Sequence, residues 1–309
     1  MALVVEDLVK VYPNGKKAVN HISFSVRKGS LFAFLGENGA GKSTTINIIC
    51  SILSKDQGKI LVEGYDLDKQ RLAIKQILGV VFQSSVLDNN LMVYDNLALR
   101  ASFYSLPDDV VRKQVDDIVK LLDLGPILKQ KVGTLSGGQK RRVDIARAIV
   151  HSPKFLILDE PTTGLDPKAR KMVWGLIDKI RRETGMTVFL TTHYLEESEL
   201  ATYVVIMDHG EIVARGTPNE LKNAYSNDTL LVYHKADPEL NDRMNRGGLN
   251  FTFDPEKKVY RIVAKDTQEA SRLLLDYSDV FQDVEIRKGT MDDVFLRVIG
   301  REKQPDEEK

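Results

Sequence analysis

The sequence predicts an α/β protein with a mostly parallel sheet, an inserted helical subdomain and a small second domain of the α+β type. Three observations lead to this prediction. Up to about residue 220, short and nearly continuous apolar runs alternate with longer helical patterns, which is typical of parallel strands buried on both faces. Between about residues 84 and 150, helical patterns follow one another with no strand between them. After Leu221 a new alternation of strands and helices begins.

The strands and helices of the first domain, residues 1–221, are predicted segment by segment. The apolar runs LFAFLG, GVVFQ, FLILDE, TVFLTTH and YVVIMDHG predict the core strands. The segments NNLMVYDNLALRASFYSL, DDVVRKQVDDIVKLLDL and GQKRRVDIARAIV carry helical patterns and predict the inserted subdomain. We expect the basic cluster Lys140, Arg141 and Arg142 on a solvated helix face.

The second domain is expected at residues 222–300. The segments TLLVYH, PELNDRMN, LNFTF, KVYRIVA, TQEASRLLLDYS and VFQDVEIR follow the order β-α-β-β-α-β, which is the order of the split-βαβ or ferredoxin-like motif. A final helix, MDDVFLRVIG, follows. Residues 301–309 are expected to form a disordered, solvated tail.

Composition excludes several classes of protein. The 44 basic and 44 acidic residues balance, so we expect no nucleic-acid partner. The single cysteine, Cys50, excludes an intrachain disulfide and fits a reducing compartment. The chain shows neither an uncharged stretch long enough to span a membrane nor the layout of a signal peptide. We therefore expect a cytosolic chain, unless another protein holds it at a membrane.

A phosphate-binding loop is predicted at residues 36–44, GENGAGKST. It fits the pattern G-x-x-x-x-G-K-[ST] and lies between a predicted strand and a predicted helix, as the motif requires. Backbone N–H groups of the loop and the helix N-terminus would bind phosphates, Lys42 would reach the β and γ oxygens, and the Ser43 hydroxyl would bind Mg²⁺. The expected contacts are Gly36, Asn38, Gly39, Ala40, Gly41, Lys42, Ser43 and Thr44.

Polar side chains end three further predicted strands: Gln83, the pair Asp159 and Glu160, and His193. Ligands of open α/β sheets bind at the carboxyl ends of the strands, so these side chains should meet the loop there. We expect Asp159 to hold Mg²⁺ and Glu160 to orient or deprotonate the attacking water. Gln83 would contact Mg²⁺ or the water, and His193 would donate to the γ-phosphate. For Gln83 and His193, a purely structural role as satisfied polar residues remains the alternative.

A second possible anion site lies in TLSGGQKRR, residues 134–142. Ser136 is a predicted helix N-cap, and Gln139 completes a capping box. Gly137 and Gly138 then fall in the first turn, where each costs about 1 kcal/mol relative to alanine. Such glycines usually permit a close approach to the backbone, and a helix N-terminus suits an anion. The alternative is a capped helix start with two accidental glycines.

In this order, the loop GENGAGKST, LSGGQKRR, LILDEPTTGLDP and His193 resemble the ATP-binding subunit of an ABC transporter. The resemblance covers about residues 1–220 and implies an ATPase that uses ATP and Mg²⁺. It matches Tyr12 to the aromatic residue that stacks on adenine, and Asp166 to a loop that crosses to a partner. The alternatives are a solvent-facing strand tyrosine and a turn aspartate before Pro167.

The resemblance also implies two partners. One is a second ATP-binding subunit, as a homodimer or heterodimer, arranged head to tail. Ser136, Gly137, Gly138 and Gln139 of each subunit would then bind ATP held by the loop of the other, and hydrolysis would loosen the pair. The other partner is a separately encoded integral membrane permease, which would hold the chain at the cytoplasmic face of the membrane. The helical insertion would face it, with Met92, Tyr94, Phe103 and Tyr104 as possible contacts.

Within the family, LDEPTTGLDP and MDDVFLRVIG are most similar to the drug-export branch, the multidrug and daunorubicin-resistance type. This implies export of drugs or other small molecules. The alternative is a soluble ABC-type ATPase that acts on ribosomes or DNA. A single uninterrupted cassette, the absence of a heptad run and the zero net charge favour the transport reading.

Overall fold

The computed structural model describes residues 1–104 and 107–300. The chain forms two compact units, Met1–Arg215 and a second unit that begins at Gly216. The division therefore precedes the expected border at residues 221 and 222, which lies inside helix α8 (Pro218–Tyr225). The expected disordered tail at 301–309 lies outside the described residues.

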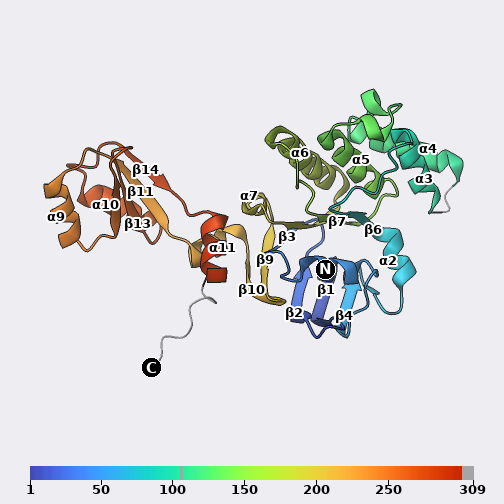
Figure 1. Cartoon of the computed structure of the whole chain (residues 1–309), viewed down its shortest axis with the longest axis horizontal. Helices are drawn as coiled ribbons and strands as arrows, with labels where there is room; N and C mark the ends of the chain where they lie inside the picture. The colour runs from blue at the N-terminus through green and yellow to red at the C-terminus, as the bar shows by residue number, and fades with distance from the viewer. Residues whose placement is uncertain (105–106, 301–309) are drawn as a thin grey trace. The chain divides into compact units, whose positions relative to one another are not determined.

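The first unit is built on a six-stranded sheet in the order β10-β9-β3-β8-β7-β6 (Figure 1). The neighbouring pairs from β9 to β6 are parallel, as the sequence predicts. The strands are β3 (Leu31–Gly36), β6 (Leu78–Val81), β7 (Phe155–Asp159), β8 (Thr187–Thr192), β9 (Tyr203–Asp208) and β10 (Glu211–Gly216). Because parallel strands end on the same side, this sheet carries the phosphate-binding loop and the predicted polar strand ends at one edge.

A second, antiparallel sheet in the first unit was not anticipated. Its order is β2-β1-β4-β5, with β1 (Leu3–Val11), β2 (Lys17–Val26), β4 (Gln57–Val62) and β5 (Tyr65–Asp66). Strand β2 alternates buried Ile22, Phe24 and Val26 with exposed residues, which is the period of a strand with one buried face. The prediction relied on continuous apolar runs, so it overlooked this alternation.

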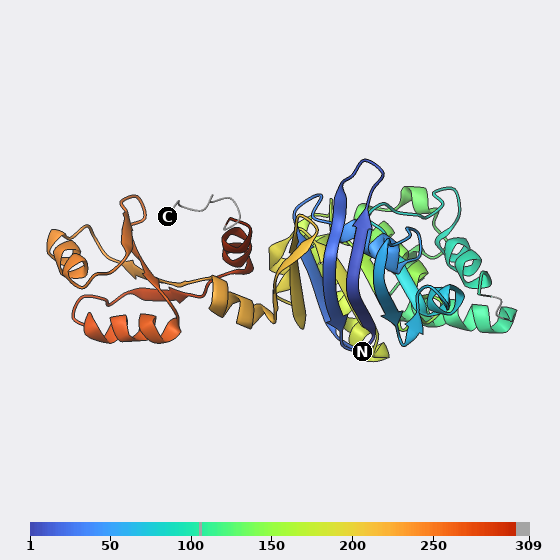
Figure 2. The same ribbon diagram turned by 90° about the horizontal axis from the view of Figure 1, so that it is seen from below.

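Phenylalanine side chains join the two sheets. Phe24 of β2 packs against Phe34 of β3 with ring centroids 5.2 Å apart, and Phe32 stacks on Phe189 of β8 at 5.2 Å. All four rings belong to the buried core. Figures 1 and 2 show the antiparallel sheet, in blue, lying against the parallel one. The parallel sheet is therefore fixed from one side by the antiparallel sheet and covered on the other by helices.

The expected helical subdomain is confirmed between β6 and β7. Within the part of this segment that the structure describes, the only β pairing is an isolated bridge between Met92 and Lys131. Its helices are α3 (Val93–Ser102), α4 (Asp108–Leu121) and α5 (Gly137–Ile149), with 3₁₀ turns η1 (Gly125–Ile127) and η2 (Val132–Thr134). The other helices of the unit are α1 (Lys42–Ile49), α2 (Arg71–Ile77), α6 (Pro167–Thr184) and α7 (Leu195–Ser198). None of the described helices is both long and apolar enough to span a bilayer.

The second unit has the element order expected from the sequence. After α8 come β11 (Asp228–Tyr233), α9 (Pro238–Arg246), β12 (Phe251–Asp254), β13 (Val259–Ala264), α10 (Thr267–Asp276), β14 (Val284–Arg287) and α11 (Met291–Gly300). The strands form an antiparallel sheet in the order β12-β13-β11-β14. Apolar residues of β11, β13, α9 and α10 share one buried cluster. The unit therefore has a core of its own.

His151 is a buried polar residue of the first unit, just after α5. Its ring stacks on Tyr104 with centroids 3.9 Å apart and an interplanar angle of 7°. Its Nε2 lies 3.2 Å from the Leu78 carbonyl oxygen, whereas its Nδ1 has no partner among the described residues. Burial, and then the nearby charge of Arg100, lower the pKa of His151 to about 4. The imidazole is therefore neutral at physiological pH.

This pKa predicts a pH-dependent stability. From its ordinary pKa of 6.5 down to about 4, His151 binds a proton in the unfolded chain but not in the folded one, so acidification favours unfolding. Between pH 7.5 and pH 5 the loss should be on the order of 2 kcal/mol. Urea unfolding followed by the fluorescence of the single tryptophan, Trp174, measures it. His151→Phe should lack this loss, whereas a substitution at exposed His209 should retain it; equal slopes would contradict the assignment.

Candidate active site

The phosphate-binding loop lies between β3 and α1 and depends on Gly41. Gly41 is the N-cap of α1 with φ 108°, a left-handed conformation that disfavours side chains. A Cβ atom at this position would also collide with the carbonyl oxygen of Ala18 on β2. The antiparallel sheet therefore holds the loop tightly against the start of the helix, and only glycine fits there.

Lys42 is buried within this loop. Its Nζ donates hydrogen bonds to the carbonyl oxygens of Gly36, at 2.7 Å, and Glu37, at 3.0 Å. Burial lowers its pKa, and the negative charges of Glu160 and Asp159 oppose this shift. The ammonium group is thus held at the carboxyl edge of the sheet by hydrogen bonds that phosphate oxygens can replace.

Tyr12 lies beside the loop rather than on an open strand. It follows β1 and is half-buried, and its hydroxyl oxygen is 3.2 Å from Oγ1 of Thr44. The turn that follows it is closed by a hydrogen bond from the Tyr12 N–H to the Lys16 carbonyl. An aromatic ring is therefore present next to the expected phosphate contacts.

Asp159, the last residue of β7, is held by the neighbouring strand. Thr191 of β8 donates its hydroxyl to Oδ1 of Asp159 at 2.6 Å. Burial raises the pKa of Asp159; the Thr191 hydrogen bond and the positive charges of Lys42 and Arg141 oppose the rise. The carboxylate therefore has a fixed orientation at the end of the sheet.

The carboxylate of Glu160 contacts two other predicted residues, Gln83 and His193. Its carboxylate Oε2 accepts hydrogen bonds from Gln83 Nε2 at 3.0 Å and Thr163 Oγ1 at 3.2 Å, and His193 Nδ1 lies 3.3 Å away. Its backbone has φ 46°, a left-handed conformation that costs about 1 kcal/mol in a residue with a side chain. Strained residues of this kind concentrate at functional sites. The structure thus brings Gln83, Glu160 and His193 together.

The helix start predicted at Ser136 is present. Ser136 Oγ accepts from the Gln139 N–H at 3.3 Å, and the Gln139 side chain accepts from the Ser136 N–H at 2.9 Å, which is the expected capping box. A Cβ atom on Gly138 would lie 2.9 Å from Cβ of Ala169. Close packing of α5 on α6 therefore accounts for this glycine. Gly137 is exposed, so its backbone remains open to a ligand.

Asp166 lies next to this turn. It is the N-cap of α6, with its carboxylate accepting from the Ala169 N–H at 2.9 Å, and it is exposed. The side chain of Leu165 is the nearest group, at 3.6 Å, to the Cβ position of Gly137. The starts of α5 and α6 therefore form one surface that carries both predicted partner-binding elements.

The predicted residues consequently fall into two groups. Within the described ranges, no hydrogen bond or ion pair joins residues 136–139 or Asp166 to the loop at 36–44. The sheet edge holds the loop, Tyr12, Gln83, Asp159, Glu160 and His193. The N-termini of α5 and α6 hold the second group, which consists of residues 136–139 and Asp166.

Arg141 is a structural residue of the site that the sequence prediction placed wrongly. It is 7 % exposed instead of solvated. Its guanidinium donates to the carbonyl oxygens of Phe82, Asp159, Glu160 and Pro161. It therefore ties α5 to the strand ends that carry Gln83 and the two carboxylates. The sequence does contain a signal for this burial. Helical spacing places Arg141 on the same face of α5 as Asp144 and Ala148, which are also buried.

The oxygen donors of the sheet edge fit Mg²⁺. Asp159 supplies a carboxylate, Ser43 an exposed hydroxyl, and Gln83 an amide oxygen that remains available because its nitrogen binds Glu160. Among the described residues no cluster of three or more His, Cys, Asp or Glu forms a metal cage. Mg²⁺ is usually held by one or two carboxylates together with substrate phosphates, so this donor set suits it.

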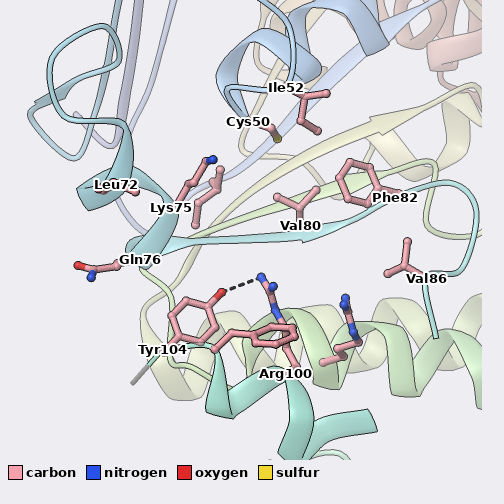
Figure 3. A pocket seen from close by; sticks show the side chains of 13 residues that line it. Cys50, Ile52, Leu72, Lys75, Gln76, Val80, Phe82, Val86, Arg100 and Tyr104 are labelled. Atoms are coloured by element: carbon pink, nitrogen blue, oxygen red, sulfur yellow. Dashed lines mark hydrogen bonds between the residues drawn. The ribbon is translucent and has the colours of Figure 1, made fainter. Parts of the chain in front are cut away.

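A groove lies between the sheet and the helical subdomain, with a volume of about 560 Å³. Its lining includes the apolar residues Leu78, Val80 and Phe82, which Figure 3 shows in part, and the exposed side chains Ile52, Leu72 and Phe103, which are 62 %, 78 % and 65 % exposed. Of the four possible partner contacts, Phe103 and Tyr104 line this groove. Met92 and Tyr94, at the start of α3, do not.

A strand–loop–helix phosphate site with a carboxylate pair at a nearby strand end defines a P-loop nucleoside triphosphatase. A family model described as ABC transporter matches residues 19–163. The chain is 40 % identical over 231 residues to a linearmycin resistance ATP-binding protein of Bacillus subtilis, covering 74 % of this chain and 73 % of that protein. It is 33 % identical over 311 residues to a daunorubicin resistance ATP-binding protein of Streptomyces coeruleorubidus, covering 98 % and 97 %.

Among solved structures, the fold is similar to a dimeric ATP-binding cassette in a post-hydrolysis state with ADP and Pi. The TM-score is 0.63 and the identity 26 %, over 70 % of this chain and 98 % of that one. The chain belongs to the ABC transporter family, as an ATP-binding, ATP-hydrolysing subunit, and its relatives include proteins of the drug-resistance branch. The resemblance drawn from the sequence is thereby confirmed.

Arg141→Met is expected to destabilise the first unit by roughly 3 kcal/mol, because buried carbonyl oxygens lose their donor. ATP turnover should fall with it, since the same carbonyls position Asp159 and Glu160. The matched control is Arg142→Met on the same helix, which is partly exposed and should cost less than about 1 kcal/mol. Urea unfolding and ATPase assays of both variants measure the effect; similar losses in the two variants would contradict this role.

Proposed function

We propose that the chain is the ATP-hydrolysing subunit of a membrane exporter for drugs or other small molecules, and that it works as a head-to-tail pair. The observation that carries this proposal is the division of the expected ATP contacts into two groups on one chain. The sheet edge can hold a nucleotide, and the helix starts at Ser136 and Asp166 face outward without contact to it. Two copies arranged head to tail would join one group to the other.

ATP binding begins at the sheet edge. The backbone N–H groups of the loop and the N-terminus of α1 attract the phosphates. Lys42 exchanges its carbonyl partners for the β and γ oxygens, which keeps its buried charge compensated. Tyr12 stacks on the adenine from its position beside Thr44.

Hydrolysis requires a positioned water and a stabilised γ-phosphate. Glu160 orients or deprotonates the water, and His193, next to Glu160, donates to the γ-phosphate as its charge grows. Ser43, Gln83 and Asp159 would hold Mg²⁺, which neutralises charge on the phosphate oxygens. Thr191 and Arg141 keep the two carboxylates in place.

The second group completes the site of the partner copy. The Ser136 hydroxyl and the exposed amide of Gly137 lie at a helix N-terminus, which suits the γ-phosphate. Gly138 and Gln139 shape this turn, and Asp166 lies beside it. The dimeric state of the similar cassette supports this arrangement. ATP thus bridges the two copies, and loss of the γ-phosphate after hydrolysis weakens the bridge.

A separately encoded membrane permease is the proposed second partner. The groove lined by Phe103 and Tyr104 exposes large apolar side chains, as protein-docking surfaces do. Docking there would hold the chain at the cytoplasmic face of the membrane. The names of the two similar drug-resistance proteins support drugs or other small molecules as the exported class.

Glu160→Gln should lower ATP turnover about 100-fold or more, because the amide cannot accept the proton, while ATP binding is retained. The matched control is Glu183→Gln, an exposed residue near the end of α6, which should leave turnover unchanged. Turnover is measured by phosphate release and binding by a fluorescent ATP analogue. Near-normal turnover of Glu160→Gln would remove Glu160 from this role.

A further inference from the structure

Glu197 of α7 is a buried acid to which the proposed mechanism gives no role. It is 4 % exposed, and each of its carboxylate oxygens accepts a hydroxyl: Thr162 donates to Oε1 at 2.5 Å and Thr192 to Oε2 at 2.6 Å. Within residues 1–104 and 107–300 no ion pair joins it to a Lys, Arg or His. A carboxylate is costly to bury without a counter-charge, so the two hydroxyl hydrogen bonds are what stabilises it there.

Thr192 ties this carboxylate to the segment that carries His193. It is the last residue of β8 and is buried. Its hydroxyl oxygen also accepts a hydrogen bond from the Tyr194 N–H at 2.9 Å. The Thr192 hydroxyl thus closes a turn around His193, and Glu197 holds this hydroxyl in place. Because His193 Nδ1 lies 3.3 Å from the Glu160 carboxylate, the position of the imidazole at the site depends on this short segment.

Thr162 ties the same carboxylate to the loop that follows β7. Its side chain is fully buried, and its carbonyl oxygen accepts a hydrogen bond from the Leu165 N–H at 3.1 Å. This bond closes the turn that leads into Asp166, the N-cap of α6 on the surface proposed to meet the partner copy. Glu197 therefore joins the segment of His193 to the turn that ends at Asp166.

A second contact joins the same two segments without Glu197. The guanidinium carbon of Arg170 lies 4.0 Å from the centroid of the Tyr194 ring, and the rings of His193 and Tyr194 are 4.2 Å apart. Arg170 belongs to α6, one turn after Asp166, and its N–H donates to the Asp166 carbonyl at 2.9 Å. A displacement of His193 would therefore change contacts on both sides of Asp166.

We propose that Glu197 is a positioning residue for ATP hydrolysis: it holds His193 in place for the γ-phosphate and couples that position to Asp166 at the surface of the partner copy. The proposal rests on the roles proposed above for His193 and Asp166 and names the residue that links them. Among the described residues, no hydrogen bond or ion pair joins Glu197 to the loop at 36–44. Glu197 should therefore affect turnover and pairing, but not the affinity of the single chain for ATP.

Removal of one hydroxyl at a time tests the link. Thr162→Val and Thr192→Val keep the side-chain volume but leave Glu197 with one donor. Each should lower kcat by roughly tenfold, while the Kd for ATP, measured at protein concentrations too low for pairing, stays within about twofold. Thr162→Ser, which keeps the hydroxyl, should retain kcat within about threefold. Unchanged kcat in both valine variants would overturn the proposal.

The matched control is Thr187→Val, at the opposite end of the same strand. Thr187 is buried, and its hydroxyl oxygen accepts a hydrogen bond from the Gly29 N–H at 2.9 Å. Its loss should lower the stability measured by urea unfolding, but leave kcat within about twofold. A loss of kcat in Thr187→Val as large as in Thr192→Val would show a general effect of losing a buried hydroxyl, and would overturn the proposal.

A double-mutant cycle distinguishes positioning from a purely structural role. Glu197→Gln keeps the side-chain volume, so it also serves if the valine variants do not fold, and its amide offers one oxygen instead of two. It should lower kcat in the unmodified chain but by less than about twofold more in the His193→Ala chain. Single-turnover assays over hours measure the residual rates. Equal losses in the two backgrounds would show that Glu197 does not act through His193.

Pairing separates this inference from the proposed function. In the Glu160→Gln background, the ATP concentration for half-maximal pairing should rise at least about fivefold with Thr162→Val and stay unchanged with Thr187→Val. An unchanged ATP dependence in Thr162→Val would overturn the link to Asp166 while leaving the head-to-tail pair intact. Absence of any ATP-dependent pair in Glu160→Gln alone would instead overturn the proposed pair, and the kcat measurements would still test the link to His193.

Discussion

The rest of the site depends on one buried guanidinium. Arg141 donates to the carbonyl oxygens of Phe82, Asp159, Glu160 and Pro161, which lie at or just beyond the ends of two neighbouring strands. A buried carbonyl oxygen that loses its donor costs about 1–3 kcal/mol, and of these four carbonyls that of Glu160 has a second donor in the Thr163 N–H, at 3.3 Å. The same bonds hold Glu160 in its strained left-handed conformation. Arg141 thus sets the positions of both carboxylates relative to the helical subdomain.

Because Arg141 belongs to α5, one helix connects three surfaces. The helix begins at the exposed turn of Ser136 and Gly137, passes the sheet edge at Arg141 and reaches the groove at Arg147. With a rise of 1.5 Å per residue, the first and last of these positions are roughly 16 Å apart. A rigid helix cannot move at one end without moving at the other. The proposed pairing through ATP and the proposed docking of a permease are therefore expected to be energetically linked through α5.

The parts of the site that the sequence predicts are those encoded by local pattern. The loop at 36–44, the strand-end residues Asp159 and Glu160, and the capping box at Ser136 each combine a short motif with a strand or helix boundary. Arg141 escaped prediction because its partners are backbone carbonyls, which have no sequence signature. Gly138 was expected to let a bound phosphate approach the backbone; the structure places Ala169 of α6 against it, and the contact with ATP stays a prediction. The antiparallel sheet was missed because alternating strands such as β2 are less conspicuous than continuous apolar runs.

The most direct test of the account is native mass spectrometry of the Glu160→Gln protein with Mg²⁺ and ATP, with and without Ser136→Arg. The account predicts that Glu160→Gln alone gives a pair of chains with two ATP molecules. Adding Ser136→Arg should leave ATP bound to the single chain and abolish the pair, whereas Ser136→Thr, which keeps the capping hydroxyl, should retain it. Loss of ATP from the single Ser136→Arg chain would mean that the turn acts within its own chain, and a persistent pair would mean that it takes no part; either result would contradict the shared site.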